Sequence, residues 1–172
     1  MDLKQAFRHV PDFPKAGIDF IDITTVLQDP DSLVCAVDEL CKRAEKYDFD
    51  LIVSPESRGF ILGTPMCYKL HKGFVPVRKK GKLPAETISY EYDLEYGSAV
   101  LEIHKDAIQK GQKVILIDDL LATGGTTLAN IKLIERLGGV VVAVVCLVEL
   151  TYLNGRKRLS EYNVESVVTF EE

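Results

Sequence analysis

The stretch VILIDDLLATGGTTLANIKLIERLG, residues 114–138, decides the fold. It opens with four apolar residues, passes through Asp118 and Asp119, and continues into a loop that contains Gly124 and Gly125. From Leu128 onward, apolar residues recur at helical spacing as far as residue 137. The pattern predicts a buried strand, a glycine loop and a helix, in that order. In open parallel sheets, ligands bind at the carboxyl ends of such strands.

Further strands and helices are predicted on both sides of this unit. Residues 140–150 are apolar at nearly every position, which is typical of a strand buried on both faces of a parallel sheet. Other strands are predicted at residues 49–54, 74–78 and 164–170, a hairpin or long arm at 86–104, and a loop or edge strand at 18–24. Short helices are predicted at residues 3–10 and 105–111. A longer helix is predicted from about residue 31, with Asp31 as its N-cap, and another after residue 57, which Pro65 must perturb. This alternation predicts an α/β fold, a parallel central sheet flanked by helices, in a single domain of residues 1–172.

The composition of the chain is that of an ordinary globular domain. Its 172 residues are 47% hydrophobic and 27% charged, and no apolar run approaches the roughly 20 residues that a membrane span needs. The N-terminus lacks a secretory pattern, and the four cysteines form no CxxC pair, so we expect a cytoplasmic protein with reduced thiols. The net charge of −5 argues against nucleic-acid binding. Two basic clusters, at residues 78–82 and 156–158, are either solvated loops or local anion sites.

The glycine loop suits a phosphate, but it is not a common nucleotide motif. It lacks the lysine of GxxxxGK[ST] and the spacing of GxGxxG. The free N–H groups of a helix N-terminus and the hydroxyls of Thr123, Thr126 and Thr127 could bind a phosphate. Asp118 and Asp119 would repel that phosphate unless they hold something else, and ribose hydroxyls or a magnesium shell would suit them. The loop therefore predicts a phosphorylated sugar, and the alternative is a tight strand-to-helix turn with capping threonines.

VILIDDLLATGGTT resembles the diphosphate-sugar signature of the type I phosphoribosyltransferases, and DDLLATGGT is most similar to the members that act on adenine. The segments PDFPKAGIDFIDIT, ESRGFILG, VRKKGKLP and YDLEYGSAVLEIHKDAI match that family in order and spacing. The resemblance implies a small hood at residues 1–30 and a mobile arm at residues 83–104. It implies purine salvage, in which adenine and 5-phospho-α-D-ribose 1-diphosphate (PRPP) give AMP and diphosphate. It also implies that Mg²⁺ is carried by PRPP, with no metal held directly by the protein, and that the chain forms a homodimer.

The resemblance also implies roles for particular residues. The 5′-phosphate would bind Ala122, Thr123, Gly124, Gly125 and Thr126, and the ribose hydroxyls would bind Asp118 and Asp119. The diphosphate would meet Ser57, Arg58, Arg78, Lys79 and Lys82, of which Arg58 is also assigned to catalysis. Family members hold a non-proline cis peptide just before this arginine, which places it at Glu56–Ser57.

The base and its proton are assigned in the same way. Glu95 of the arm would hold or remove the base proton, and Tyr96 would help to close the arm over the site. Phe20 and Leu120 would be the apolar faces of the base pocket, while backbone groups near Asp19 and Ile21 would recognise the amino edge of adenine.

Two alternatives remain open. One is transfer to another purine base, although enzymes for oxopurines usually carry an acid at the position of Ala122. The other is a PRPP-sensing regulator, although only about ten residues precede PDFP, too few for a helix-turn-helix module.

Overall fold

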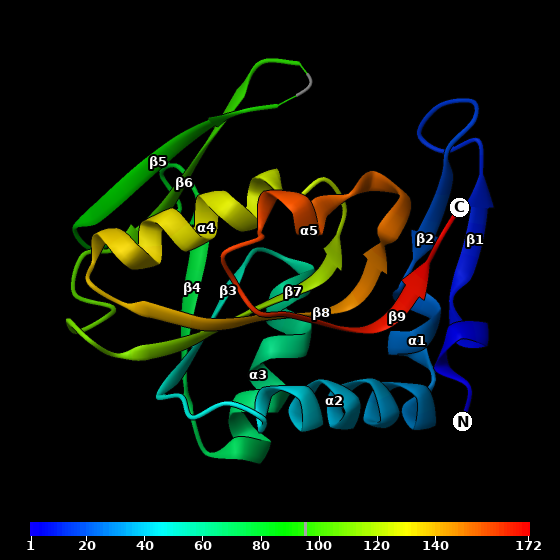
Figure 1. The fold of residues 1–172 in the computed structure, drawn as a ribbon, viewed down its shortest axis with the longest axis horizontal. Coiled ribbons are helices and arrows are strands. Elements are labelled where there is room, and N and C mark those ends of the chain that lie inside the picture. Colours follow the sequence, from blue (N-terminus) through cyan, green and yellow to red (C-terminus); the bar gives the residue numbers. More distant parts are fainter. Residues whose placement is uncertain (95) are drawn as a thin grey trace.

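The computed structural model describes residues 1–94 and 96–172, so Glu95 lies outside the described residues. Within that part of the chain, seven strands form one sheet in the order β5-β6-β4-β3-β7-β8-β9 (Figure 1). Its parallel strands are β3 (Leu51–Pro55), β4 (Gly73–Lys79), β7 (Lys113–Leu121), β8 (Val140–Leu150) and β9 (Val164–Phe170). The α/β fold with a mostly parallel central sheet is confirmed.

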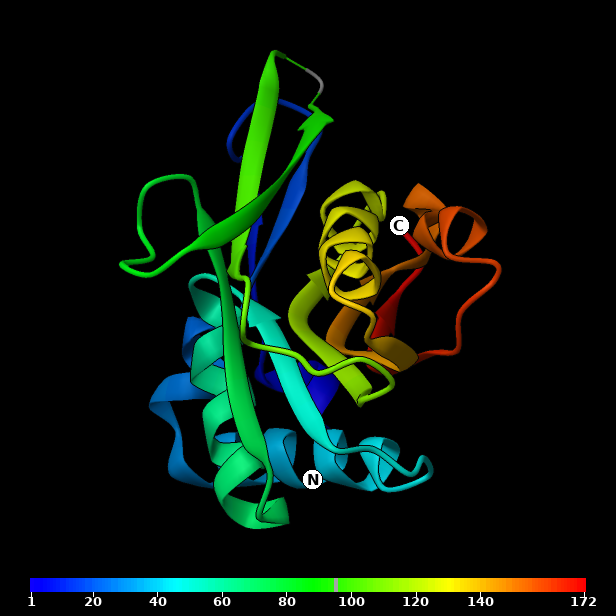
Figure 2. The ribbon, with the colours of Figure 1, turned by 90° about the vertical axis from the view of Figure 1, so that its left-hand side faces the viewer.

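Helices cover both faces of this sheet (Figure 2). Helices α2 (Pro30–Ala44) and α3 (Arg58–Leu70) pack on one face, and α4 (Gly125–Arg136) packs on the other. Alternate side chains of β7 point to opposite faces, so Ile115 and Ile117 join the first core, while Val114 and Leu116 join the second. The strands read as continuous apolar runs because both of their faces are buried.

The arm predicted at residues 83–104 contains a β-hairpin. Strands β5 (Thr87–Asp93) and β6 (Ser98–His104) pair antiparallel, and β6 continues the main sheet by pairing antiparallel with β4. The end of β5 and the start of β6 extend beyond the helices, and β5 lies along α4 (Figures 1 and 2).

The first 28 residues form a small two-stranded sheet with two short helices, which we call the hood and which packs into the same core as α2 and α3. It contains the short 3₁₀ helix η1 (Leu3–Ala6), strands β1 (Arg8–Pro11) and β2 (Asp19–Asp22), and helix α1 (Thr24–Gln28). The Phe7 ring packs edge-on against Phe170 of β9, with 5.9 Å between the ring centroids. This contact joins the hood to the last strand of the main sheet.

Three local predictions are wrong. The helix predicted at residues 3–10 ends at Ala6, because Arg8 already pairs with Asp22 across the hood sheet. The helix predicted at residues 105–111 is a series of turns, in which the Gln109 amide donates to the side chain of Gln112 at 2.7 Å. The N-cap of α2 is Asp29 instead of Asp31, since the Asp29 carboxylate accepts from the Ser32 amide and Pro30 fits the first helical turn.

Two short helices complete the chain between β8 and β9. The 3₁₀ helix η2 (Thr151–Leu153) follows β8, and α5 (Gly155–Arg158) lies beside the start of α4 (Figure 1). The last strand expected there is present. Among the described residues, no helix is both long and apolar enough to cross a membrane.

Candidate active site at the strand ends

A cavity of about 470 Å³ opens at the carboxyl ends of β3, β4 and β7. Three chain segments far apart in sequence meet there, as expected for a parallel sheet. The lining residues are Pro55, Glu56, Ser57, Arg58, Lys79, Asp118, Asp119, Leu120, Ala122, Thr123, Gly124, Gly125, Thr126 and Thr127. The cavity thus gathers the glycine loop, both acids and two of the four cationic residues that the sequence suggested, Arg58 and Lys79.

Gly124 shapes the glycine loop where it enters α4. It has a φ of 85°, in the left-handed region that glycine adopts without strain. A Cβ at this position would also lie 2.9 Å from the carbonyl oxygen of Gly155, so the two backbones touch. The first N–H groups of α4 follow directly and have no partners within the helix, which makes this turn a suitable anion site.

The two acids are held at the end of β7 by local contacts. The Asp119 amide donates to Asp118 Oδ1 at 2.8 Å. Asp119 is only 5% exposed, and its Oδ2 lies 2.7 Å from Arg58 Nε as an ion pair without hydrogen-bond alignment. The start of α3 can come this close because residue 59 is glycine, where a Cβ would lie 2.2 Å from Ser54 Oγ.

Asp118 is in an unfavourable position for an ionised group. Burial raises its pKa well above the usual value, and the neighbouring charge of Asp119 raises the pKa further. The charge of Arg58 lowers the pKa but offsets only part of this effect. A ligand that donates hydrogen bonds to the ionised Asp118 would relieve the strain, which is what ribose hydroxyls can do.

Glu56 joins the ends of β3 and β4, a role that the sequence analysis missed. Its Oε1 accepts from the Lys79 amide at 2.8 Å and from Arg78 Nε at 3.3 Å. The peptide bond between Glu56 and Ser57 is cis, as the resemblance implied. The signal in the sequence was only an acid beside Ser57 and Arg58, which did not reveal its partners on β4.

The basic cluster at residues 78–82 divides in the structure. Lys79 lines the cavity, whereas Arg78 turns to Glu56 and Lys82 lies in the exposed turn after β4. Arg78 and Lys82 are therefore not among the lining residues of this cavity.

The residues expected to bind the base do not meet in one cavity. Leu120 lines the main cavity, but Phe20 lines a second one, of about 440 Å³, in the hood. The Ile21 side chain is buried in the core, so its backbone is the part that could contact a ligand. Asp19 contacts the imidazole of His9.

The arm reaches the glycine loop through one polar contact. Tyr92 of β5 places its hydroxyl 3.1 Å from Thr126 Oγ1, and this contact was not foreseen from the sequence. Tyr96, near the tip, is exposed. The proposed proton carrier, Glu95, lies outside the described residues.

In residues 1–94 and 96–172, no group of three or more His, Cys, Asp or Glu side chains could hold a metal ion. The acids of the cavity still offer oxygen donors, which are the ligands that Mg²⁺ prefers.

Comparison with known proteins agrees with this fold. Residues 28–171 match the family model of the phosphoribosyl transferase domain, which defines the class of the protein. A curated relative, the adenine phosphoribosyltransferase of Caldicellulosiruptor saccharolyticus, is 67% identical over 171 residues, or 99% of this chain and 98% of the relative.

Solved structures give the same result. The crystal structure of adenine phosphoribosyltransferase from Thermoanaerobacter pseudethanolicus matches with a TM-score of 0.95 and 55% identity, covering 98% of each chain. The Saccharomyces cerevisiae enzyme in complex with adenine and an imino-altritol bisphosphate matches with a TM-score of 0.91 and 38% identity, covering 97% of each chain. The chain belongs to the adenine phosphoribosyltransferase family.

Proposed function

We propose that the protein transfers the phosphoribosyl group of PRPP to adenine, which gives AMP and diphosphate in purine salvage. The observation that carries the proposal is the single cavity in which the ATGGT loop, Asp118 and Arg58 lie together. The solved yeast relative holds adenine together with a bisphosphate, a pair of ligands with the chemistry of these two substrates.

The cavity offers a distinct partner for each part of PRPP. The 5′-phosphate binds the loop from Ala122 to Thr126, where backbone N–H groups at the start of α4 are available. The ribose hydroxyls donate to Asp118, with Asp119 beside it. The diphosphate binds Ser57, Arg58 and Lys79, which line the same cavity, and Arg58 is half-exposed there.

The reaction needs one bond made, one bond broken and one proton moved. N9 of adenine attacks C1 of the ribose as the bond from C1 to the diphosphate oxygen breaks, through an oxocarbenium-like transition state. The purine proton passes to Glu95 as a general base, and Tyr96 helps to exclude water from the site. Adenine lies between the hood and the main cavity, where Phe20 contacts one face of the base and Leu120 the other. Backbone groups of Asp19 and Ile21 recognise its amino edge.

Mg²⁺ enters with PRPP in this proposal. The carboxylate oxygens of Asp118 and Asp119 are donors of the kind that this ion accepts. When bound, Mg²⁺ offsets the charge of the diphosphate leaving group. The compartment is the cytoplasm, where free thiols such as those of Cys41 and Cys67 stay reduced.

The function is tested by incubating the protein with PRPP, Mg²⁺ and one purine base at a time. We expect AMP from adenine and little or no nucleotide from hypoxanthine, guanine or xanthine. If only an oxopurine gave a nucleotide, that base and not adenine would be the substrate. A protein that binds PRPP but forms no nucleotide with any base would be a sensor instead of an enzyme.

A further inference from the structure

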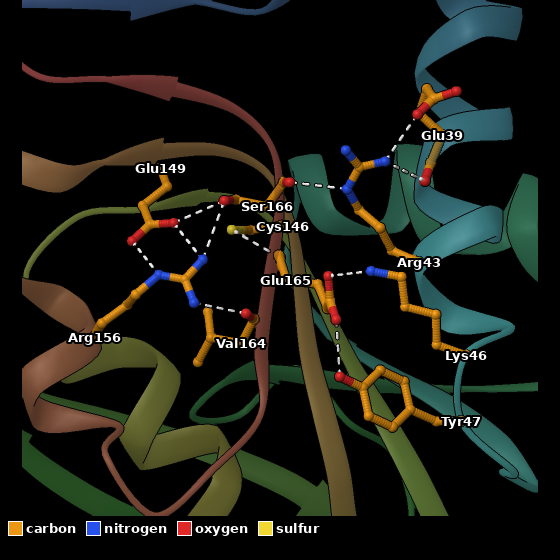
Figure 3. A network of polar contacts seen from close by, with 10 residues as sticks. All are labelled: Glu39, Arg43, Lys46, Tyr47, Cys146, Glu149, Arg156, Val164, Glu165 and Ser166. Carbon is orange, nitrogen blue, oxygen red and sulfur yellow. Dashed lines mark hydrogen bonds and ion pairs between the residues drawn. The ribbon is translucent and has the colours of Figure 1, made fainter.

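An ion pair between a buried glutamate and a half-exposed arginine lies behind the glycine loop. Glu149, one residue before the end of β8, is only 3% exposed (Figure 3). Arg156 of α5 binds it with two parallel hydrogen bonds, Nε to Oε1 at 2.7 Å and Nη2 to Oε2 at 2.8 Å. Such a bidentate pair fixes both the distance and the orientation of the two side chains.

The other polar groups around this pair are also satisfied. Ser166 Oγ donates to Glu149 Oε2 at 2.7 Å, and Arg156 Nη1 donates to the Val164 carbonyl at 2.7 Å. Burial raises the pKa of Glu149, but the hydrogen bonds from Arg156 and Ser166 outweigh burial and hold that pKa below its usual value. The short helix α5 is therefore tied to both β8 and β9 through one arginine.

The residue before Arg156 touches the glycine loop itself. A Cβ on Gly155 would lie 2.4 Å from the Ala122 carbonyl oxygen, and a Cβ on Gly124 would lie 2.9 Å from the Gly155 carbonyl oxygen. The backbone of α5 is thus the rear wall of the turn that enters α4. In the sheet, Glu149 of β8 pairs with Leu121 of β7, the residue that directly precedes Ala122 of the loop.

We propose that the Glu149–Arg156 pair is a positioning device for the phosphate loop, which acts by holding Gly155 against Ala122 and Gly124. The pair touches no substrate, so its effect is on the placement of the loop amides. This inference rests on the proposed binding of the PRPP 5′-phosphate by that loop. Loosening the pair weakens PRPP binding and leaves adenine binding nearly unchanged.

The experiment compares four variants with the wild type. Glu149→Gln removes the carboxylate charge, and Arg156→Lys removes the guanidinium that makes the two parallel hydrogen bonds. Gly155→Ala adds a methyl group that displaces the loop, while the Glu149–Arg156 pair stays intact. Glu165→Gln is the matched control: Glu165 lies next to Ser166, but its side chain accepts from Lys46 and Tyr47 at 2.8 and 2.9 Å, and among the described residues no hydrogen bond joins that side chain to α5 (Figure 3). The measurements are the melting temperature, kcat, and KM for PRPP and for adenine.

The first three variants should raise the KM for PRPP about tenfold, since a misplaced binding group commonly has effects of this size or larger. Their kcat and KM for adenine should stay within about twofold of wild type, and Glu165→Gln should leave all three constants unchanged. The proposal is overturned if folded Arg156→Lys and Gly155→Ala keep the wild-type KM for PRPP. It is equally overturned if Glu165→Gln raises this KM as much as they do.

Hydrogen exchange of the ligand-free protein separates this inference from the proposed function. Amides 123–127 should exchange faster in Arg156→Lys than in wild type or Glu165→Gln, whether or not the wild type makes AMP. Unchanged exchange in Arg156→Lys would reject the positioning role. A wild type that makes no nucleotide would reject the proposed function alone.

Discussion

At the scale of single residues, we expect Asp118 to favour ligand binding at the expense of the stability of the folded protein. It follows a run of buried residues on β7 and adjoins a second acid, so its ionised form is disfavoured in the folded protein. The charge of Arg58 offsets only part of this. We interpret the site as one that accepts a less stable folded state in order to present a strong acceptor to the ribose hydroxyls.

Asp118→Asn should therefore stabilise the protein while it damages PRPP binding. Because the folded-state pKa of Asp118 lies above its ordinary value of 3.8, wild-type stability falls as the pH rises from about that value through the folded-state pKa. The asparagine variant lacks this loss, so its gain in melting temperature over wild type should be larger at pH 8 than at pH 4. Calorimetry at the two pH values measures the difference, and an equal gain at both would contradict the interpretation.

In the same variant the KM for PRPP should rise about 10- to 100-fold, the usual range for losing a hydrogen bond to a charged group. An unchanged KM for PRPP would mean that Asp118 does not bind this substrate.

Glu95 makes a second prediction at this scale. Glu95→Gln should lower kcat about 100- to 10,000-fold, the typical contribution of a general acid or base, and should leave PRPP affinity within about twofold. Glu91→Gln is the control, because Glu91 is an exposed acid of the same arm whose described contact is with Ser98. If Glu95→Gln kept its turnover, the proton would have to move through another group.

At the scale of elements, β5 of the arm contacts α4, the helix whose start we propose binds the phosphate. The Tyr90 ring lies 4.8 Å from the Arg136 guanidinium near the end of α4, while Tyr92 contacts Thr126 at its beginning. The two tyrosines are two residues apart and therefore face the same side of the strand. The arm and the loop can thus affect each other without a shared ligand.

Tyr92→Phe should raise the KM for PRPP about two- to tenfold, because one hydrogen bond at the loop is lost. Tyr90→Phe is a matched change, since the Tyr90 hydroxyl makes no hydrogen bond among the described residues. Steady-state kinetics of the two variants make the comparison. Equal effects would mean that the Tyr92 hydroxyl has no specific role at the loop.

At the scale of the whole molecule, one face of α3 is poorly covered. Ile61 and Tyr68 are 45% and 91% exposed, and they lie seven residues apart on the same side of the helix. We expect this face to lie in a homodimer interface, so light scattering should give twice the chain mass of 19.2 kDa.

Tyr68→Asp should shift the protein toward the monomer, whereas Tyr152→Asp, at an exposed aromatic residue of η2, should not. A monomeric wild type would exclude the dimer. If the Tyr68→Asp variant stayed dimeric, the dimer interface would have to lie on another face of the molecule.

Prediction from sequence succeeded where short-range pattern and final environment agreed. The continuous apolar run of β8 predicted a strand buried on both faces, and the β-branched and aromatic residues among the acids of residues 86–104 predicted the hairpin of β5 and β6. The helix predicted at residues 105–111 failed because seven residues of helical appearance are too few to form a stable helix. The base pocket was the least complete prediction, because Phe20 and Leu120 belong to different layers.

The sequence by itself determined the unit of strand, glycine loop and helix that contains Asp118, Asp119 and Gly124. It could do so because local backbone preference and neighbouring residues set such a turn. Only the tertiary structure decided that Arg58 pairs with Asp119, that Glu56 holds the end of β4, and that Gly155 supports the loop. These contacts join residues 23 to 61 positions apart, or cross from one element to another. They depend on strand order and packing, which no local pattern in the chain records.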